Sequence, residues 1–382
     1  MRSFLSATPE PSLHFVTQQP RSLGRHAALA LLAVALVAAQ GCKKEEAAAP
    51  PPAPGGAPKP GAAAPAAGAA AGAAAAAAKT GTNAPAAAAG ANDTVDLRLN
   101  WPVGKRFLQR MDIAFESETT MAGLPQGARQ ETVQSMDYTV SVLKDREGGG
   151  RELELEIVAQ KTDAKVAAKQ SVAFDSKSDP KTDRANAPAG ALRKLVGLKI
   201  HYLTDTNGLI EKVVGAQELQ SKLIATATPQ TKIILTTLLS EENLKRAVNL
   251  AIGLPDKPVK VSETWSAQRD NNLGPLGIMQ MDLKSTFKGW EEHDKRRCAL
   301  IEYSGPVTAK PGTAAPPMTV TVENGKVTGK IWFDPVSGMI ADASLEQEGT
   351  TKIVVSGQTA ESKSKTKTSV KVVEVGDVPK AN

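Results

Sequence analysis

The sequence predicts an α+β fold: a long, curved antiparallel sheet, half-barrel-like in plan, that carries a small helical cluster from the middle of the chain. Between residues 94 and 382, apolar and polar residues alternate with period two, which places them on opposite faces of strands. Alternation with short turns favours antiparallel pairing, because parallel strands that are buried on both faces form continuous apolar runs. A single stretch, 216–252, has the three- to four-residue period of helices instead.

The strand predictions follow the alternation along the chain. In the first strand, one side carries Phe107, Gln109, Met111, Ile113 and Phe115. The glycines of 148–150 supply the positive φ angles that a hairpin between the second and third strands needs, and Asn324-Gly325 is typical of a type I′ turn. Strands are expected over 105–117, 136–142, 153–157, 171–174, 198–203, 209–214, 278–290, 297–303, 318–323, 327–333, 339–348, 352–356 and 363–375.

Three helices are expected within 216–252. Pro229 and Ser240 mark the breaks between them, and Ser240 can cap the third helix. Gly253 then ends that helix. The helical cluster therefore separates two series of strands.

The two series have a loosely repeated plan. Residues 197–210 and 329–340 are each a strand, a turn that starts with Asp and contains Gly, and a second strand. Trp101 and Trp265 each precede a long strand. The pattern suggests an internal duplication.

The charge of the chain argues against nucleic-acid binding. The sequence has 46 Lys and Arg against 40 Asp and Glu, and half of the net +6 lies in residues 1–93. The remaining +3 over 289 residues is no basic footprint. With two Cys and four His, we expect no disulfide scaffold, no metal site and no cofactor.

Residues 1–41 are typical of a secretory signal peptide. Their apolar run, 27–39, follows two arginines and is too short to span a bilayer, which takes about 20 helical residues. Gly41 and Cys42 resemble the cleavage site of bacterial lipoproteins, in which the cysteine is lipidated and becomes the first residue. In that family an Asp after the cysteine retains the protein in the inner membrane. Lys43 here implies an outer-membrane anchor that faces the periplasm.

A tether and a single folded domain are expected after the signal. Of the 45 residues in 47–91, 40 are Ala, Pro or Gly, which cannot bury enough surface to offset the entropy of ordering. Residues 42–93 are therefore the lipidated cysteine and a disordered linker with a reach of roughly 40 Å, and 94–382 form one β-rich domain. Initiation at Val16 would give a compact signal without residues 1–15.

The sequence lacks the motifs of familiar catalytic machinery, including G-x-S-x-G, H-E-x-x-H and G-x-x-x-x-G-K-[ST]. His201, on the polar side of a strand, and His293, in a charged turn, are expected to be solvated or hydrogen-bonded. Cys298 is expected to be a small buried hydrophobic residue. We expect a non-enzymatic protein. The alternative is a hydrolase whose cleft gathers His201, Asp205 and a serine.

Two rows of like charges follow single strands. The glutamates of 152–156 repeat about every 6.8 Å along one side, which is typical of a solvated sheet face, although acid–base or calcium chemistry is the alternative. The lysines of 363–371 favour an edge strand that is protected from pairing with other chains, with contact to anionic membrane lipid as the alternative.

These features together resemble the uncharacterised bacterial lipoproteins classed as a domain of unknown function. The resemblance rests on the signal at Cys42, the tether, the one-sided strands and the unit GKIWFDPVSG at 329–338. More distantly, the plan is similar to the half-barrel lipoprotein-localisation factors, in which helices close over a concave, apolar sheet face that holds acyl chains. The resemblance implies a membrane-anchored protein that binds an apolar ligand or an envelope protein.

Methionines on the apolar side of the sheet are the expected contacts for such a ligand, because Met adapts to irregular apolar partners. The helices would form a lid whose apolar residues face the concavity, and completion of an ordinary core is the alternative. The candidate ligand-binding residues are Met111, Met136, Leu219, Leu223, Met279 and Met281.

Overall fold

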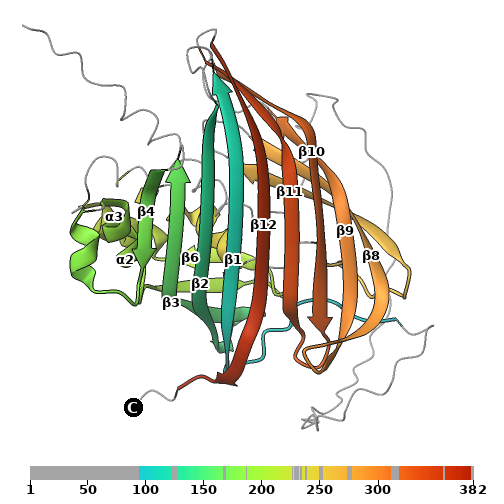
Figure 1. The fold of residues 1–382 in the computed structure, drawn as a ribbon. Coiled ribbons are helices and arrows are strands. Elements are labelled where there is room, and N and C mark those ends of the chain that lie inside the picture. The colour runs from blue at the N-terminus through green and yellow to red at the C-terminus, as the bar shows by residue number, and fades with distance from the viewer. Residues whose placement is uncertain are drawn as a thin grey trace, which may run out of the picture.

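The computed structural model describes residues 94–379 except 122–126, 167–168, 186, 226, 228–231, 233–234, 237–238, 249–252, 273–277, 311–317 and 356–357. In this part the chain forms one open, antiparallel, 12-stranded sheet with a few short helices (Figure 1). The strands are β1 (Lys105–Met121), β2 (Ala128–Asp145), β3 (Arg151–Val166), β4 (Lys169–Asp175), β5 (Lys199–Thr204), β6 (Ile210–Val214), β7 (Thr264–Asn272), β8 (Ile278–His293), β9 (Arg296–Lys310), β10 (Met318–Asp334), β11 (Met339–Val355) and β12 (Gln358–Asp377). The helices are η1 (Pro180–Ala185), α2 (Ala187–Arg193), α3 (Ala216–Ala225) and α5 (Glu241–Val248).

The sheet consists of two meanders, β1 to β6 and β7 to β12, and in both of them successive strands are added toward the same edge of the sheet. Its strand order is β6-β5-β3-β2-β1-β12-β11-β10-β9-β8-β7, and β4 pairs with β3. The meanders join where β1 pairs with β12 along its whole length, from Lys105↔Asp377 to Met121↔Ala360. The predicted fold class, with a long antiparallel sheet and mid-chain helices, is confirmed.

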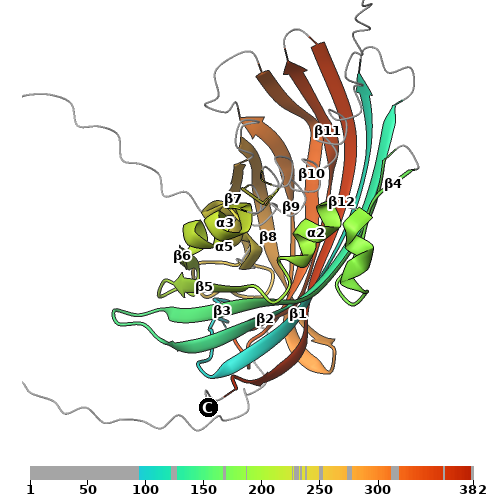
Figure 2. The same ribbon diagram turned by 90° about the vertical axis from the view of Figure 1, so that its left-hand side faces the viewer.

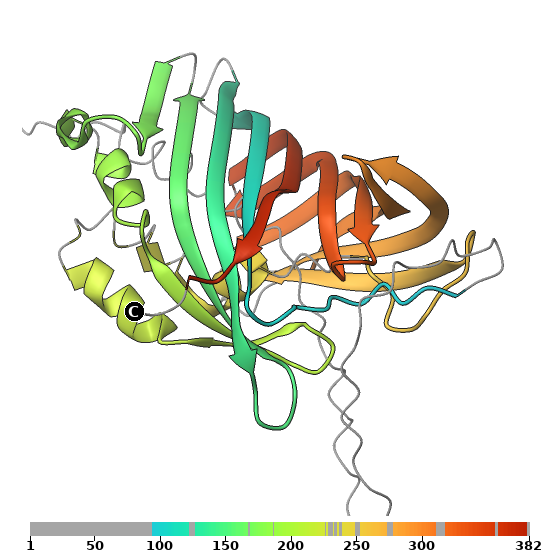
Figure 3. The ribbon, with the colours of Figure 1, turned by 90° about the horizontal axis from the view of Figure 1, so that it is seen from below.

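The sheet is strongly curved, and α3, α5 and the hairpin β5–β6 lie on its concave side (Figure 2). Seen from below, the strands form an arch from the green strands of the first meander to the orange strands of the second (Figure 3). The main core fills the space between this concave face and the helical segment, to which Leu235, Leu239, Leu244 and Val248 contribute buried side chains. Among the described helices, none is long and apolar enough to cross a membrane.

The helical segment agrees with the prediction where it is described. Helix α3 begins directly after Gly215, which has a φ of 74°, and α5 begins after Ser240, whose carbonyl accepts the N–H of Leu244 at 2.9 Å. The predicted middle helix lies mostly outside the described residues. Helix α2 was not predicted; its Ala189 packs on Phe174 of β4 in a small separate core.

The predicted turn at Asn324-Gly325 is wrong. Strand β10 continues through both residues, and the register shifts between Glu323 and Lys326. Asn324 has a φ of 52°, so the pair forms a β-bulge. The sequence signal was ambiguous because a bulge and a tight turn both need a residue with positive φ. The strand stays extended here because it pairs with β9 on one side and with β11 on the other.

Other strand boundaries also differ from the prediction. The segments expected at 339–348 and 352–356 are one strand, β11, and β7 was not predicted at all. The hairpin between β2 and β3 is confirmed, with φ angles of 86°, 99° and 84° at its three glycines. The repeated units also form the expected hairpins, β5–β6 and β10–β11.

The prediction that the lysine-bearing strand is an edge is wrong. Strand β12 lies in the middle of the sheet between β1 and β11. Its lysines face acidic residues across the strands, as in the contacts of Lys365 with Glu346 and Glu348. Local sequence carries no information on this pairing, because β1 and β12 come from opposite ends of the folded chain.

Candidate functional site

The concave face of the sheet is the candidate site. Along β1, the side chains of Phe107, Gln109, Ile113 and Phe115 are buried on this face. Arg110, Asp112 and Ala114 lie on the solvated side. A similar alternation continues through β12 and β9, as the one-sided sequence pattern predicts, whereas residues 138–142 of β2 are buried on both faces.

The predicted ligand-contacting residues all belong to the main core or pack against it. Met111 and Met136 are cross-strand partners on β1 and β2 and are half-buried. Met279 and Met281 of β8 are buried, whereas Leu219 and Leu223 of α3 are half-buried against the same core. The structure thus brings the six residues to one side of the sheet, and their role in binding stays a prediction.

Curvature brings distant strands into contact across the concave face. The side-chain amide of Gln347 on β11 donates a hydrogen bond to Sδ of Met279 on β8 at 3.3 Å, although β9 and β10 lie between these strands. Tyr303 of β9 likewise reaches over Gly329 of β10 and donates to the carbonyl of Ser344 on β11 at 3.2 Å. A side chain at Gly329 would meet the Tyr303 ring at 2.2 Å, so this crossing requires glycine.

Polar side chains are buried on this face without partners. Gln109, Tyr138 and Tyr202 are 0%, 1% and 0% exposed, and the amide of Gln109 and both phenol hydroxyls have no hydrogen-bond partner among the described residues. An unpaired buried polar group costs about 1–3 kcal/mol. Further unpartnered atoms on this face are the hydroxyls of Thr132, Ser285 and Thr368 and Oε1 of Gln347.

Burial also dominates the electrostatics of these groups. Desolvation raises the pKa of Tyr138, and desolvation together with the neighbouring Tyr138 phenol raises the pKa of Tyr202. Both phenols therefore stay protonated and can donate or accept hydrogen bonds. The sequence pattern had placed Gln109 on the dry side of its strand. A glutamine among apolar residues was the one available signal of this site, and it was missed.

The two residues named for the alternative hydrolase, His201 and Asp205, have separate partners. His201 is on the solvated face, with Nε2 3.4 Å from Oε2 of Glu154. Oδ1 of Asp205 accepts the N–H groups of Asn207 and Leu209 in the β5–β6 turn. Burial raises the pKa of Cys298 to about 11, as expected for a small buried residue with no nucleophilic role.

His293 is hydrogen-bonded, in agreement with its prediction, and it also packs against the sheet. Its ring stacks on Trp332 at 4.4 Å, and its Nε2 lies 3.0 Å from Asp342 Oδ2 and 3.8 Å from Asp294 Oδ2. Such a group could hold a cation. However, the ammonium of Lys371 already lies 2.7 Å from Asp294 Oδ2 and, through this hydrogen bond, lowers the pKa of that carboxyl.

Charges on the solvated face are balanced. A shallow depression of about 730 Å³ crosses its middle. It is lined by lysines, acidic residues and small polar residues, together with Ile113, Ala114, Val133, Tyr303 and Leu345. Ion pairs such as Lys330–Glu302 at 3.2 Å account for this pattern. The glutamates of 152–156 behave in the same way, since Glu154 pairs with Lys199 at 2.9 Å. The surface therefore favours no particular ligand.

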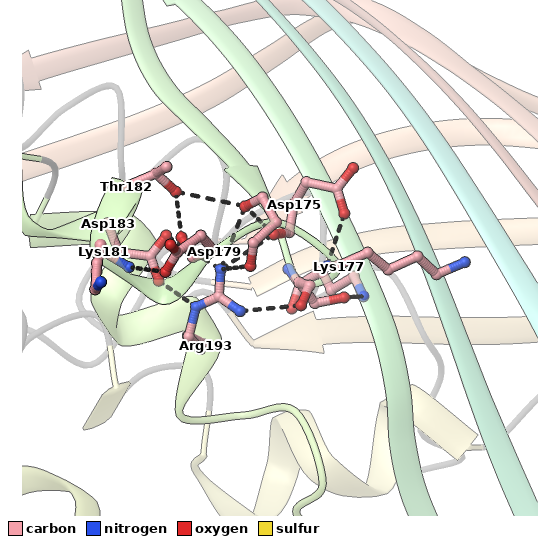
Figure 4. A network of polar contacts seen from close by, with 10 residues as sticks. Asp175, Lys177, Asp179, Lys181, Thr182, Asp183 and Arg193 are labelled. Atoms are coloured by element: carbon pink, nitrogen blue, oxygen red, sulfur yellow. Dashed lines mark hydrogen bonds and ion pairs between the residues drawn. The ribbon is translucent and has the colours of Figure 1, made fainter.

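A second polar network fixes the small helices to the sheet edge (Figure 4). Arg193 of α2 forms an ion pair with Asp183 of η1 and donates to the carbonyls of Ser176 and Asp175. Its guanidinium also lies 5.2 Å from the centre of the Phe174 ring. The Arg193 guanidinium is thus already engaged by a carboxylate, two carbonyls and an aromatic ring, so we assign this network a role in stability and not in ligand binding.

The fold and the site define a class of protein: a single curved antiparallel sheet whose concave, apolar face is covered by helices and contains unpaired polar groups. The chain belongs to DUF6263, a family of unknown function, whose model matches residues 150–340. This agrees with the predicted relationship to proteins of unknown function. The similarity to lipoprotein-localisation factors stays a prediction. Cys42 lies outside the described residues.

Similarity to known proteins is otherwise low. A lipovitellin structure concerned with lipid–protein interactions has a TM-score of 0.40 and 13% identity, and the match covers 74% of this chain and 26% of that one. A protein from Bacteroides fragilis NCTC 9343, described as exported and as having a YmcC-like fold, has a TM-score of 0.19 and 8% identity, over 70% of this chain and 97% of that one. No curated protein matches the sequence.

Proposed function

We propose that this protein is a lipid-anchored protein of the bacterial cell envelope that holds an apolar ligand against the concave face of its sheet. The anchor would be Cys42, at the end of the signal peptide, with the tether between lipid and domain. The proposal includes the outer membrane, facing the periplasm, as the location, since Lys43 follows the cysteine.

The observation that carries the proposal is the composition of the concave face. An ordinary core has its buried polar atoms paired, whereas this face combines buried apolar side chains with unpartnered polar atoms on at least four strands. A ligand with a long apolar part and a polar group would satisfy both. We favour binding over catalysis because His201 and Asp205 are engaged separately and lie away from this face.

Probe binding tests the proposal. The mature protein, residues 42–382, with Cys42→Ser lacks the anchoring thiol and the apolar signal and can be studied without detergent. We expect saturable binding of the uncharged apolar dye N-phenyl-1-naphthylamine, seen as increased fluorescence. Met111→Gln should weaken this binding about tenfold, because it places an amide on the concave face. Val133→Gln is the matched control, since Val133 is 61% exposed on the opposite face and should change nothing. Absence of saturable binding would contradict the proposal.

A further inference from the structure

The three unpaired side chains share the concave face, and two of them are direct neighbours. Gln109 of β1 and Tyr138 of β2 are direct cross-strand partners on the concave face. Tyr202 of β5 lies on the same face, with β3 between it and Tyr138. Together they offer an amide N–H₂, an amide C=O and two hydroxyls, none of which has a partner among the described residues.

Two other buried aromatic donors of the core do have partners. The indole of Trp101 donates to the carbonyl of Gly208 at 2.9 Å, and the hydroxyl of Tyr303 donates to the carbonyl of Ser344 at 3.2 Å. The fold can therefore pair a buried aromatic donor with a backbone oxygen. The concentration of unpaired groups at Gln109, Tyr138 and Tyr202 thus needs another explanation, and a bound polar group provides one.

The surroundings of this trio are apolar. The cross-strand neighbours are Val372 beside Gln109, Ile157 beside Tyr138, and Leu153 beside Tyr202. A carboxylate or an ammonium here would be buried next to no opposite charge on these neighbouring positions, at a cost far above that of a neutral group. The polar group that fits is therefore uncharged.

An apolar path leads away from the trio along the same strands. Met111 follows Gln109 by two residues on β1, and Met136 precedes Tyr138 by two residues on β2, so both share the face of the trio. Both methionines are half-buried. A ligand with its polar end at the trio could lay its hydrocarbon part over them.

We propose that Gln109, Tyr138 and Tyr202 bind the uncharged polar end, an ester or alcohol group, of an acyl-chain ligand. This inference rests on the proposed function, because it assumes that the concave face takes an apolar ligand. The inference adds a ligand specificity to that function: the trio binds neutral lipids and excludes fatty acid anions.

Displacement of N-phenyl-1-naphthylamine from the Cys42→Ser protein tests the inference with three C12 competitors: monolaurin, dodecanol and laurate at pH 8. Monolaurin and dodecanol should compete at least tenfold more tightly than laurate. Tyr138→Phe and Gln109→Leu should each weaken the binding of monolaurin roughly fivefold, the value of one hydrogen bond. Neither should weaken the binding of the dye, because each makes the concave face more apolar. Neither substitution should lower the melting temperature, because neither removes a protein–protein hydrogen bond.

Tyr303→Phe is the matched control. It removes a hydroxyl that is paired within the protein, so it should lower the melting temperature and leave monolaurin affinity unchanged. If the dye binds but monolaurin and laurate compete equally, this inference is wrong and the proposed function stands. The same holds if Tyr138→Phe and Gln109→Leu have no effect on monolaurin. Either result would point to bound water at the trio. A large loss of stability in both variants would also overturn it. Absence of dye binding would overturn the proposed function.

Discussion

The indole N–H of Trp101 donates to the carbonyl oxygen of Gly208 at 2.9 Å. One residue earlier, the N–H of Asn100 donates to the carbonyl of Gly338 at 2.8 Å. Gly208 and Gly338 occupy equivalent positions in the hairpin turns β5–β6 and β10–β11, with φ angles of 77° and 65°. The two repeated units of the sequence therefore meet on the segment that precedes β1, which ties the two meanders together.

We predict that Gly208→Ala destabilises the protein by at least about 2 kcal/mol. A Cβ at this position would lie 2.6 Å from the carbonyl oxygen of Leu99, in addition to the strain of a positive φ. Gly215→Ala is the control, because Gly215 has a φ of 74° with no atom within 4 Å of the added Cβ, and it should cost only about 1 kcal/mol. Urea unfolding measures both, and equal losses would show that the contact with Leu99 is unimportant.

The residues before β1 should be needed for stability, unlike the tether. Val95 and Val259 exchange two backbone hydrogen bonds of 2.9 Å, and Leu97 and Trp101 are buried in the main core. A protein that begins at Asn92 should melt at the same temperature as the mature protein, whereas one that begins at Val103 should melt several degrees lower. Calorimetry distinguishes the two. A loss of several degrees in the longer protein would mean that the tether packs on the domain.

Lipidation should depend on Cys42 alone. Cys42→Ser should abolish incorporation of labelled palmitate and move the protein from the membrane to the soluble fraction. Cys298→Ala is the matched control, because Cys298 is fully buried in the domain, and labelling should persist. Unchanged membrane association of the Cys42→Ser protein would exclude the lipid anchor.

The helical segment should divide into a core part and a looser part. Leu244 of α5 is buried, so Leu244→Ala should cost about 2–5 kcal/mol, as measured by urea unfolding. Leu219 of α3 is half-buried, and Leu219→Ala should cost less than half as much. If α5 instead parted readily from the sheet, as a lid does, Leu244→Ala would have little effect on stability.

The site could be predicted only in part. Alternation placed Met111, Met136, Met279 and Met281 on one side of their strands, and the structure confirms that placement. The same alternation placed Gln109 among them, but a single buried glutamine has many explanations in a sequence. Its significance depends on the missing hydrogen-bond partner, which only the packed structure reveals.

The sequence by itself determined the local features of this protein. Period-two alternation specified one-sided antiparallel strands, the three-residue period specified the mid-chain helices, and glycines such as Gly208 marked the hairpins, because side-chain direction and φ preference are local properties.

Only the tertiary structure decided which strands are neighbours. The pairing of β1 with β12 placed the lysines of β12 in the middle of the sheet, and pairing on both sides turned Asn324-Gly325 from a turn into a bulge. Curvature then brought Gln347 within 3.3 Å of Met279 across two strands. These features depend on contacts between residues far apart in the chain. A local sequence pattern does not report the free energy of such contacts, so it could not predict them.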